Sequence, residues 1–184
     1  MSEKPFRFAL LVGRFQMLHL GHADMIRKAL ECADRVGILI GSSQESGTRT
    51  NPFSYELRAE ILKKVFGEQI LVAPLPDIHV GNVPRWGEYV LDTAERAFKV
   101  TPDLFVSGKE GRRESWFSGE NGRTMAELTV PKTIEISASE LRELLTLGKR
   151  KEWRTYVDPK LWPLYPRLRE AVLLSRDETE TDSI

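Results

Sequence analysis

The 184-residue chain has little of what would mark a metalloprotein, a secreted protein or a membrane protein. Its single cysteine, Cys32, lies within a helical pattern without a CxxC companion, so we expect neither a disulfide nor a zinc site. No apolar run is long enough to span a bilayer, and residues 1–5 lack a signal-peptide pattern. Because 27 basic side chains balance 27 acidic ones, binding of nucleic acid through counterion release is disfavoured. We therefore expect a cytoplasmic protein without a membrane or nucleic-acid partner.

What the chain does have is an alternation of strand-like and helix-like segments, long enough for one domain with a sizeable core. Apolar runs typical of buried strands occur at residues 8–12, 36–40, 69–73, 104–106 and 133–136. Helical patterns occur at 23–33, 55–66 (with Ser54 as N-cap), 86–98 and 139–147. This alternation predicts an α/β fold with a parallel sheet flanked by helices.

The remaining segments are expected to frame that fold. We expect one domain over residues 1–184, with the α/β core at 6–150 and a small helical C-terminal part at 151–175. The helical part would pack on the sheet or on another subunit, and residues 176–184 would be frayed. The stretch 109–124, which contains Arg112, Arg113, Trp116 and Arg123, is expected to be a loop with a solvated charged face, or else a lid over phosphates.

One motif, Gly13-Arg14-Phe15-Gln16-Met17-Leu18-His19-Leu20-Gly21-His22, joins the first strand to the first helix. Gly13 allows the backbone to approach a ligand closely. The helix N-terminus offers unpaired N–H groups and a positive dipole end to an anion. His19 and His22 are three residues apart, so both can face the same anion as donors, neutral or protonated. Two ordinary loop histidines are the alternative interpretation.

A second motif, Ile136-Ser137-Ala138-Ser139-Glu140-Leu141-Arg142, begins a later helix. Either serine can cap that helix, and Arg142 lies about one turn beyond Ser139. Hydroxyls, free helix N–H groups and a guanidinium together suit a polyphosphate, although a serine-capped helix with a solvated arginine has the same pattern. Gly13, Gly41, Ser107 and the Ser137 region all follow predicted strands, so we expect them to meet at one site.

Together, the two motifs resemble the two signatures of the nucleotidyltransferase superfamily with the His-x-Gly-His motif. The Arg-Phe-Gln element is similar to nicotinamide mononucleotide adenylyltransferases of the archaeal and bifunctional bacterial type, except that Met17 stands where that group usually has proline. The resemblance implies a Rossmann-like nucleotidyltransferase fold and direct in-line attack of a nucleotide phosphate on the α-phosphate of ATP, with release of pyrophosphate. It also implies Mg²⁺ held mainly by phosphates and water, with no protein ligand assigned.

The resemblance further implies a set of site residues. His19 and His22 would contact the ATP phosphates, His22 would stabilise the transition state, and Arg14, Ser139 and Arg142 would hold the leaving phosphates. Catalytic roles thus fall to His19, His22 and Arg142, and ATP binding to Gly13, Arg14, Phe15, Gln16, Gly21, Ser107, Gly108, Ile136, Ser137 and Ser139. Because the chain is too short for the Nudix domain of the bifunctional relatives, we expect the transferase activity alone.

The middle of the chain would select the acceptor. Residues 41–53 resemble the Gly-Ser-x-x-x-Ser…Asn-Pro-Phe stretch of the nicotinamide mononucleotide enzymes, and residues 76–86 resemble their Pro-Asp-Ile…Asn…Trp segment. Trp86 would stack on the pyridinium ring, although a tryptophan here could equally pack in the core. Nicotinamide mononucleotide binding is assigned to Ser42, Asn51, Phe53, Asp77, Asn82 and Trp86.

Two alternatives to this function stay open. One is the same fold with another acceptor: nicotinic acid mononucleotide, phosphopantetheine or a polyol phosphate. Trp86 and the Asn-Pro-Phe stretch argue against these acceptors, and a few hydrogen bonds decide between nicotinamide and nicotinic acid mononucleotide. The other is a non-catalytic nucleotide-sensing module, against which both histidines, both serines and Arg142 count. By analogy with relatives, we expect a homo-oligomer.

Overall fold

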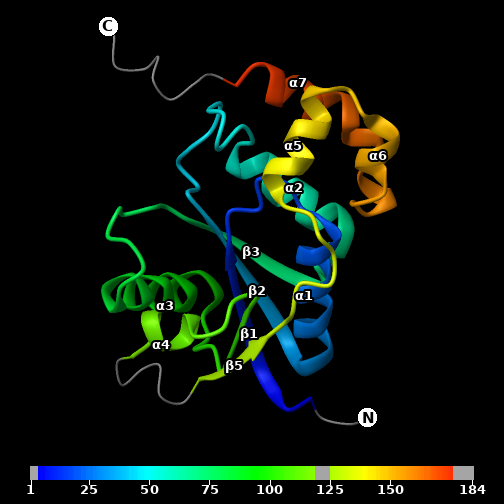
Figure 1. Ribbon diagram of the computed structural model, residues 1–184. Coiled ribbons are helices and arrows are strands. Elements are labelled where there is room, and N and C mark those ends of the chain that lie inside the picture. Colours follow the sequence, from blue (N-terminus) through cyan, green and yellow to red (C-terminus); the bar gives the residue numbers. More distant parts are fainter. Residues whose placement is uncertain (1–3, 119–124, 176–184) are drawn as a thin grey trace, which may run out of the picture.

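A parallel β-sheet forms the centre of the protein (Figure 1). The structure is a computed structural model and describes residues 4–118 and 125–175. Within these residues the sheet has five strands: β1 (Phe6–Gly13), β2 (Ala33–Gly41), β3 (Ile70–Leu75), β4 (Leu104–Ser107) and β5 (Ala126–Thr129). They lie in the order β3-β2-β1-β4-β5, and each neighbouring pair is parallel. The order reverses between β1 and β4, which is where ligands bind in sheets of this kind.

Helices connect the strands and extend the chain beyond β5. They are α1 (Leu20–Cys32), α2 (Tyr55–Phe66), α3 (Pro84–Phe98), α4 (Arg112–Trp116), α5 (Ala138–Thr146), α6 (Arg150–Arg154) and α7 (Tyr165–Leu173), with 3₁₀ turns η1 (Gly67–Gln69) and η3 (Pro159–Leu164). Ser54 caps α2 as expected, because its hydroxyl accepts a hydrogen bond from the Leu57 N–H. The predicted α/β alternation is confirmed.

Both faces of the sheet are buried, as the alternation along β1 shows. Ala9 and Leu11 face a core formed with α1, α2 and the C-terminal helices. Phe8 and Leu10 face a second core formed with α3 and α4. None of these four residues is more than 1% exposed. A strand covered on both sides must be apolar throughout, which is why the strands read as continuous apolar runs and not as alternating ones.

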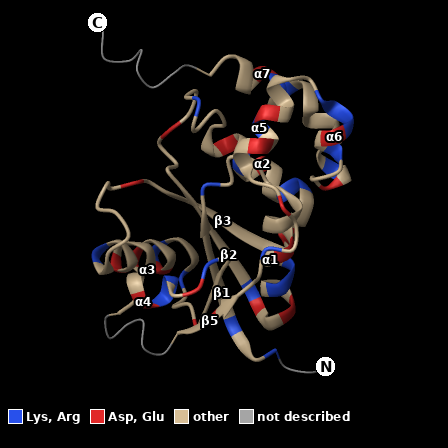
Figure 2. Cartoon of the chain, in the orientation of Figure 1, with Lys and Arg blue, Asp and Glu red and all other residues tan. Residues whose placement is uncertain are grey.

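The C-terminal helices pack on the other helices on the α1 and α2 side of the sheet, at the top right in Figure 1. Trp153 of α6 is fully buried, and the Leu20 N–H at the start of α1 donates to the Tyr156 carbonyl at 2.9 Å. The surface is mixed in charge, with basic and acidic side chains side by side on α1, α3 and α6 (Figure 2). In the described part of the chain, no helix combines the length and apolar character needed to cross a bilayer.

Two predicted elements differ from the structure. The strand expected at 133–136 is wrong: β5 is Ala126–Thr129, and 133–136 is an irregular segment leading to α5. The alternation of isoleucine with polar residues at 133–136 is typical of a strand. The segment that pairs with β4 is instead β5, a half-buried edge strand whose sequence has a weaker strand pattern. Part of the expected 109–124 loop is α4, while Arg123 and the tail 176–184 lie outside the described residues.

Candidate active site

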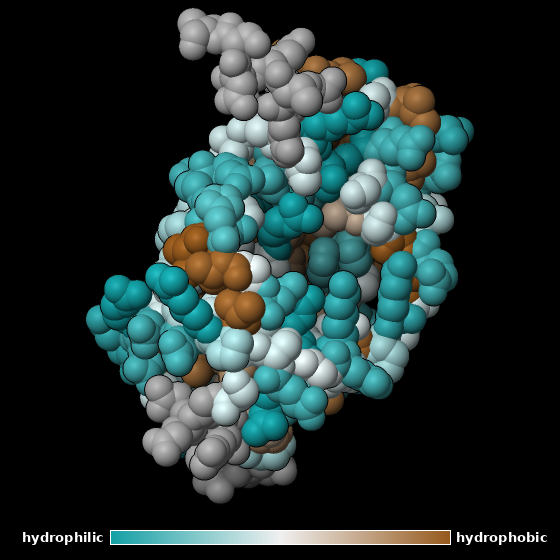
Figure 3. All heavy atoms as spheres, turned by 60° about the vertical axis from the view of Figure 1, so that its left-hand side comes forward, coloured by the Kyte–Doolittle hydropathy of each residue, from teal (hydrophilic) through white to brown (hydrophobic). Residues whose placement is uncertain are grey.

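Two adjoining cavities open at the carboxyl ends of β1, β2 and β4. We call the first, of about 500 Å³, the histidine cavity, which is lined by His19, His22, Ser139 and Arg142 among others. The second, of about 610 Å³, is the tryptophan cavity, which is lined by residues that include Ser42, Asn82, Trp86 and Trp116. Arg14 and Lys109 line both, so the cavities meet at these two cations. Figure 3 shows a largely hydrophilic face that is hollowed near its centre, with hydrophobic residues gathered beside the hollow.

The two histidines of the first motif form the start of α1. His19 is the N-cap, and its Nδ1 accepts a hydrogen bond from the His22 main-chain N–H at 3.2 Å. In the neutral ring this leaves Nε2–H as the donor. The two rings stack with centroids 3.8 Å apart. A Cβ at Gly21 would lie 3.1 Å from the His19 ring, so the glycine between the histidines leaves room for this arrangement.

Both imidazoles are neutral at pH 7. Burial, followed by the neighbouring His19, lowers the pKa of His22 to about 3, and a hydrogen bond to the Met17 backbone opposes that shift. Burial and the charge of Lys132 lower the pKa of His19 to about 4. Of the two protonation states that the sequence left open, the structure thus favours neutral hydrogen-bond donors.

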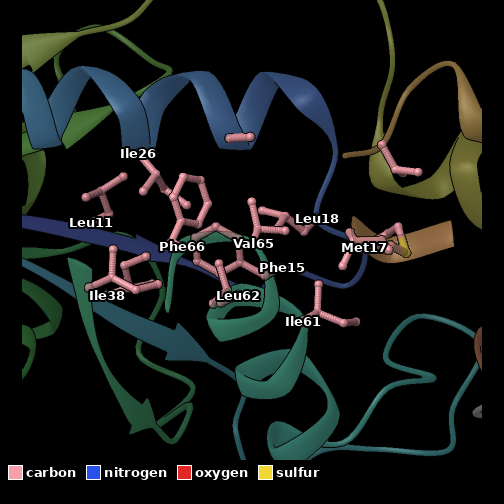
Figure 4. Packing of buried hydrophobic residues seen from close by; sticks show 14 of the residues in the cluster. Leu11, Phe15, Met17, Leu18, Ile26, Ile38, Ile61, Leu62, Val65 and Phe66 are labelled. Carbon is pink, nitrogen blue, oxygen red and sulfur yellow. The ribbon is translucent and has the colours of Figure 1, made fainter. Parts of the chain in front are cut away.

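The loop before α1 is anchored from below by apolar side chains. Phe15, Met17 and Leu18 point into the core between α1 and α2, near Ile61 and Val65 (Figure 4). Met17 is fully buried, so packing holds this position. The packing of these apolar side chains therefore fixes the position of the loop that bears His19.

Gln16 joins this loop to the segment before α2. Its buried amide donates to the Phe53 carbonyl at 3.1 Å and accepts from the Phe53 N–H at 3.0 Å. Phe53 itself is fully buried, and Asn51 donates to the carboxylate of Glu45. The contacts of Asn51 and Phe53 thus shape the loop after β2.

The second motif reaches the first through Arg142. Its Nη1 donates to the Gln16 carbonyl at 2.9 Å, and its Nη2 donates to Ser139 Oγ at 3.1 Å. Ser137 is the N-cap of α5, where it forms a capping box with Glu140. Burial, followed by the charge of Arg14, lowers the pKa of Arg142 from its ordinary value. Two helix N-termini and two arginines therefore converge on the histidine cavity.

Side chains from distant segments form the tryptophan cavity. Asn82 Oδ1 accepts hydrogen bonds from Trp116 Nε1 at 3.1 Å and from Arg112 Nη1 at 3.2 Å. The Arg112 guanidinium lies 4.6 Å from the Trp116 ring centroid, and the Trp86 ring meets Trp116 edge-on at 6.1 Å. α3 and α4 approach so closely that a Cβ at Gly87 would fall 1.6 Å from the Trp116 carbonyl oxygen. Trp86 is partly exposed here, and the buried tryptophan of the pair is Trp116.

A second contact pairs the loops that close this cavity on the β2 and β3 side. The Gln44 side chain donates to the Asp77 carbonyl at 3.2 Å and accepts from the Asp77 N–H at 2.9 Å, as a main chain would. Ser42, at the end of β2, has a φ of 46°, in the left-handed region. The loops after β2 and β3 thus form one wall.

The structure brings most of the sequence-predicted residues together, though not as one group. Asn51 and Phe53 line neither cavity among the residues that the structure describes, and Gly13 and Ser107 face the tryptophan cavity. The histidine cavity contains Arg14, Phe15, Gln16, His19, Gly21, His22, Gly108, Ile136, Ser137, Ser139 and Arg142, and the tryptophan cavity contains Ser42, Asp77, Asn82 and Trp86.

Four lining residues with a cationic or indole side chain were not among the predicted site residues: Lys109, Lys132, Arg112 and Trp116. The last two lie in a polar stretch without a motif, where two arginines that closely precede a tryptophan (Arg112-Arg113-Glu114-Ser115-Trp116) are the one available signal. The described residues contain no cluster of three or more histidine, cysteine, aspartate or glutamate side chains that could hold a metal ion.

Comparison with known proteins agrees with this geometry. A family model described as cytidylyltransferase-like matches residues 10–144. The chain belongs to that family. It is 38% identical over 154 residues to the nicotinamide-nucleotide adenylyltransferase of Methanococcus vannielii, covering 81% of this chain and 82% of that protein. The fold and family predicted from the two motifs are confirmed.

Two further comparisons support less: one covers about half of each chain, and the other shows a likeness of fold alone. The chain is 42% identical over 87 residues to the nicotinamide-nucleotide adenylyltransferase of Saccharolobus solfataricus, which covers 44% of this chain and 49% of that protein, so this match spans about half of the relative. A crystal structure of a bifunctional NMN adenylyltransferase/ADP ribose pyrophosphatase from Francisella tularensis, complexed with AMP and a manganese ion, superposes with a TM-score of 0.74 at 20% identity. It covers 91% of this chain and 52% of that chain, and the likeness shows the Rossmann-like nucleotidyltransferase fold.

Proposed function

We propose that this protein is an adenylyltransferase that joins ATP and nicotinamide mononucleotide to give NAD⁺ and pyrophosphate. The observation that carries the proposal is the meeting of the two cavities at Arg14 and Lys109. One cavity has helix N-termini and cations suited to a triphosphate, and the other has aromatic rings suited to a pyridinium. The archaeal relatives named for this activity support the assignment.

ATP would place its phosphates in the histidine cavity. Nε2–H of the neutral His19 and a ring N–H of the neutral His22 would donate to the α-phosphate region, where charge increases in the transition state. Arg14, Arg142 and Ser139 would hold the β- and γ-phosphates. Mg²⁺ would accompany ATP and offset the negative charge of its phosphates, and the structure of the bifunctional Francisella tularensis protein was solved with AMP and a manganese ion.

The acceptor would place its 5′-phosphate where the cavities meet. A phosphate oxygen attacks the α-phosphorus of ATP, one P–O bond forms, the bond to the bridging oxygen breaks, and pyrophosphate leaves with the electron pair. Because the attacking oxygen is already ionised, no general base is needed. The protein contributes by aligning the two substrates and by neutralising charge with Arg14 and Lys109.

The pyridinium ring of the acceptor would lie beside Trp86 in the tryptophan cavity. Asn82 Oδ1 already accepts two hydrogen bonds, which leaves the side-chain NH₂ group to interact with the acceptor. This group could donate a hydrogen bond to the carboxamide carbonyl on the pyridine ring. Arg112 favours nicotinic acid mononucleotide as a second candidate acceptor, because a carboxylate on the ring could receive a charge-assisted hydrogen bond from it.

The setting of the enzyme is part of the same proposal. We place the 184 residues as a single transferase domain in the cytoplasm, the compartment expected for a chain with one cysteine, Cys32, which is unpaired. We also propose a homo-oligomer, for which Leu147, Leu173 and Leu174, half or more exposed at the C-terminal helices, offer an apolar surface.

The test measures pyrophosphate release from ATP in the presence of Mg²⁺. Nicotinamide mononucleotide, nicotinic acid mononucleotide and phosphopantetheine are supplied in turn as the acceptor. We expect release with the first and NAD⁺ as the product. Arg112→Gln should selectively raise the KM for nicotinic acid mononucleotide, with exposed Arg85→Gln on α3 as the matched control. Release with phosphopantetheine alone would discard the pyridine site. ATP binding without release for any acceptor would indicate a sensing module.

A further inference from the structure

The α2 helix carries an arginine, Arg58, whose guanidinium is fully buried and contacts the backbone of both cavities. Its Nη1 donates to the Arg14 carbonyl at 2.9 Å and to the Gly41 carbonyl at 2.8 Å, and its Nη2 donates to the Ser42 carbonyl at 3.0 Å. Its Nε donates to the Ser54 carbonyl of its own helix cap at 3.3 Å. A buried cation is thus satisfied by main-chain carbonyls of three separate segments.

These carbonyls belong to the loops after β1 and β2, which carry the two halves of the site. Arg14 lines both cavities, and Ser42 lines the tryptophan cavity. Two residues of these loops, Phe15 and Ser42, have positive φ values of 49° and 46°. An L-residue other than glycine is strained there, and it stays there only when surrounding contacts determine it. Arg58 supplies such contacts, at the peptide between Arg14 and Phe15 and at the carbonyl of Ser42.

The charge on Arg58 is maintained in this buried position. Burial, followed by the charge of Arg14, lowers its pKa to about 10, while Glu45 and Glu56 oppose that shift. Arg58 is therefore a cation at pH 7, and its planar fork can hold several oxygens in fixed directions at once. A lysine has a single flexible point charge and cannot hold oxygens of three segments in this geometry.

We propose that Arg58 is a positioning residue that sets the ATP-binding loop after β1 and the acceptor-binding loop after β2 at the distance that in-line transfer needs. It contacts neither substrate and acts through Arg14 and Ser42. This inference rests on the proposed function, because the two substrates are assigned there. Its consequence is that loss of the fork reduces turnover far more than it weakens ATP binding, since His19, Ser139 and Arg142 remain in place.

The first experiment compares Arg58→Lys with the wild type, because this variant keeps the buried charge and removes the fork. We expect kcat to fall about 100-fold, a size typical of small misplacements of reacting groups, and the ATP dissociation constant to rise only a few-fold. Arg167→Ala is the matched control. Arg167 of α7 donates a hydrogen bond at 2.7 Å to Glu60, which lies on α2 like Arg58 but away from both loops. Its kcat should stay within about twofold of the wild type.

The second experiment uses Arg58→Ala with added guanidinium, which separates positioning from folding. We expect millimolar guanidinium to restore at least about tenfold in kcat to this variant and to leave Arg167→Ala unchanged, because a small planar cation can occupy the vacated space. If Arg58→Ala does not fold, Arg58→Lys still decides. A kcat of Arg58→Lys within twofold of the wild type, or a loss explained by its unfolded fraction, would overturn the proposal.

Failure of the positioning role of Arg58 can be distinguished from failure of the proposed function. A wild-type protein that releases no pyrophosphate with any acceptor refutes the function. In that case ATP binding by calorimetry still tests Arg58: a few-fold weaker affinity in Arg58→Lys but not in Arg167→Ala supports its action on the loop that carries Arg14, and equal affinities refute it.

Discussion

The histidine cavity and the tryptophan cavity are built by different means. In the first, helix caps and main-chain contacts place the functional groups: His19 caps α1, Ser137 caps α5, and Arg142 reaches the Gln16 carbonyl. In the second, contacts between side chains of distant segments do so, such as Asn82 before α3 with Trp116 of α4. Under the proposed function, the comparison teaches that the transfer chemistry would depend on the sheet and its helix ends, whereas acceptor recognition would depend on segments outside the sheet that can change without disturbing it.

The strongest way to test this comparison is to remove one histidine from each cavity. His22→Ala should keep its fold and reduce pyrophosphate release about 10²- to 10³-fold, because it removes a donor to the charge that develops at the α-phosphate. His79→Ala, at the exposed rim of the tryptophan cavity, should change release only a few-fold. If the two variants lost activity equally, the division of roles between the cavities would be wrong.

Gly87→Ala should disturb the tryptophan cavity alone. The added methyl group would overlap the Trp116 carbonyl, so α4 must move away from α3, at a cost of about 1–3 kcal/mol in the free energy of unfolding. We expect a raised KM for the acceptor and an unchanged ATP dissociation constant. The neighbouring exposed residue provides the control, Glu88→Ala, in which both constants should stay at wild-type values. Equal weakening of ATP binding in Gly87→Ala would contradict the separation.

A smaller effect is expected from Trp86→Ala. Loss of the ring should raise the acceptor KM about tenfold, equal to about 1.4 kcal/mol, which is the size of a cation–π contact in a partly desolvated site. The KM for ATP should not change. Trp162→Ala, which removes a tryptophan from the C-terminal part, should alter neither constant. An unchanged acceptor KM in Trp86→Ala would remove the stacking role.

A separate prediction concerns stability at acid pH. The folded pKa values of His19 and His22, about 4 and about 3, lie below the unfolded value of about 6.5. The unfolded chain therefore takes up protons first as pH falls, so stability present above pH 6.5 is lost toward pH 3, by at most about 1.4 kcal/mol per pH unit for each histidine. His22→Ala should show a smaller fall in Tm between pH 6.5 and 4.5, and a slope equal to that of the wild type would refute it.

Much of the fold could be predicted because its signals are local. The helix at 55–66 has its bounds and its Ser54 cap as expected, and the strands around 8–12 and 36–40 were found by their apolar runs. The strand at 133–136 was wrong because pairing beside β4, not β-propensity, decides which segment becomes the edge strand. α4 was missed because Gly87 and Trp116, which determine its docking, are far apart in the sequence.

The candidate site divides in the same manner. The sequence alone determined the two helix-capping motifs for which we propose phosphate binding, since capping and helix-end chemistry act within a few residues. Only the tertiary structure decided that Arg142 meets Gln16, that Phe53 is core, and that Asn82 bonds Trp116. It alone revealed Arg58, whose four carbonyl partners come from three segments. The reason is physical: the partners of a buried polar group are chosen by chain packing, which no local pattern encodes.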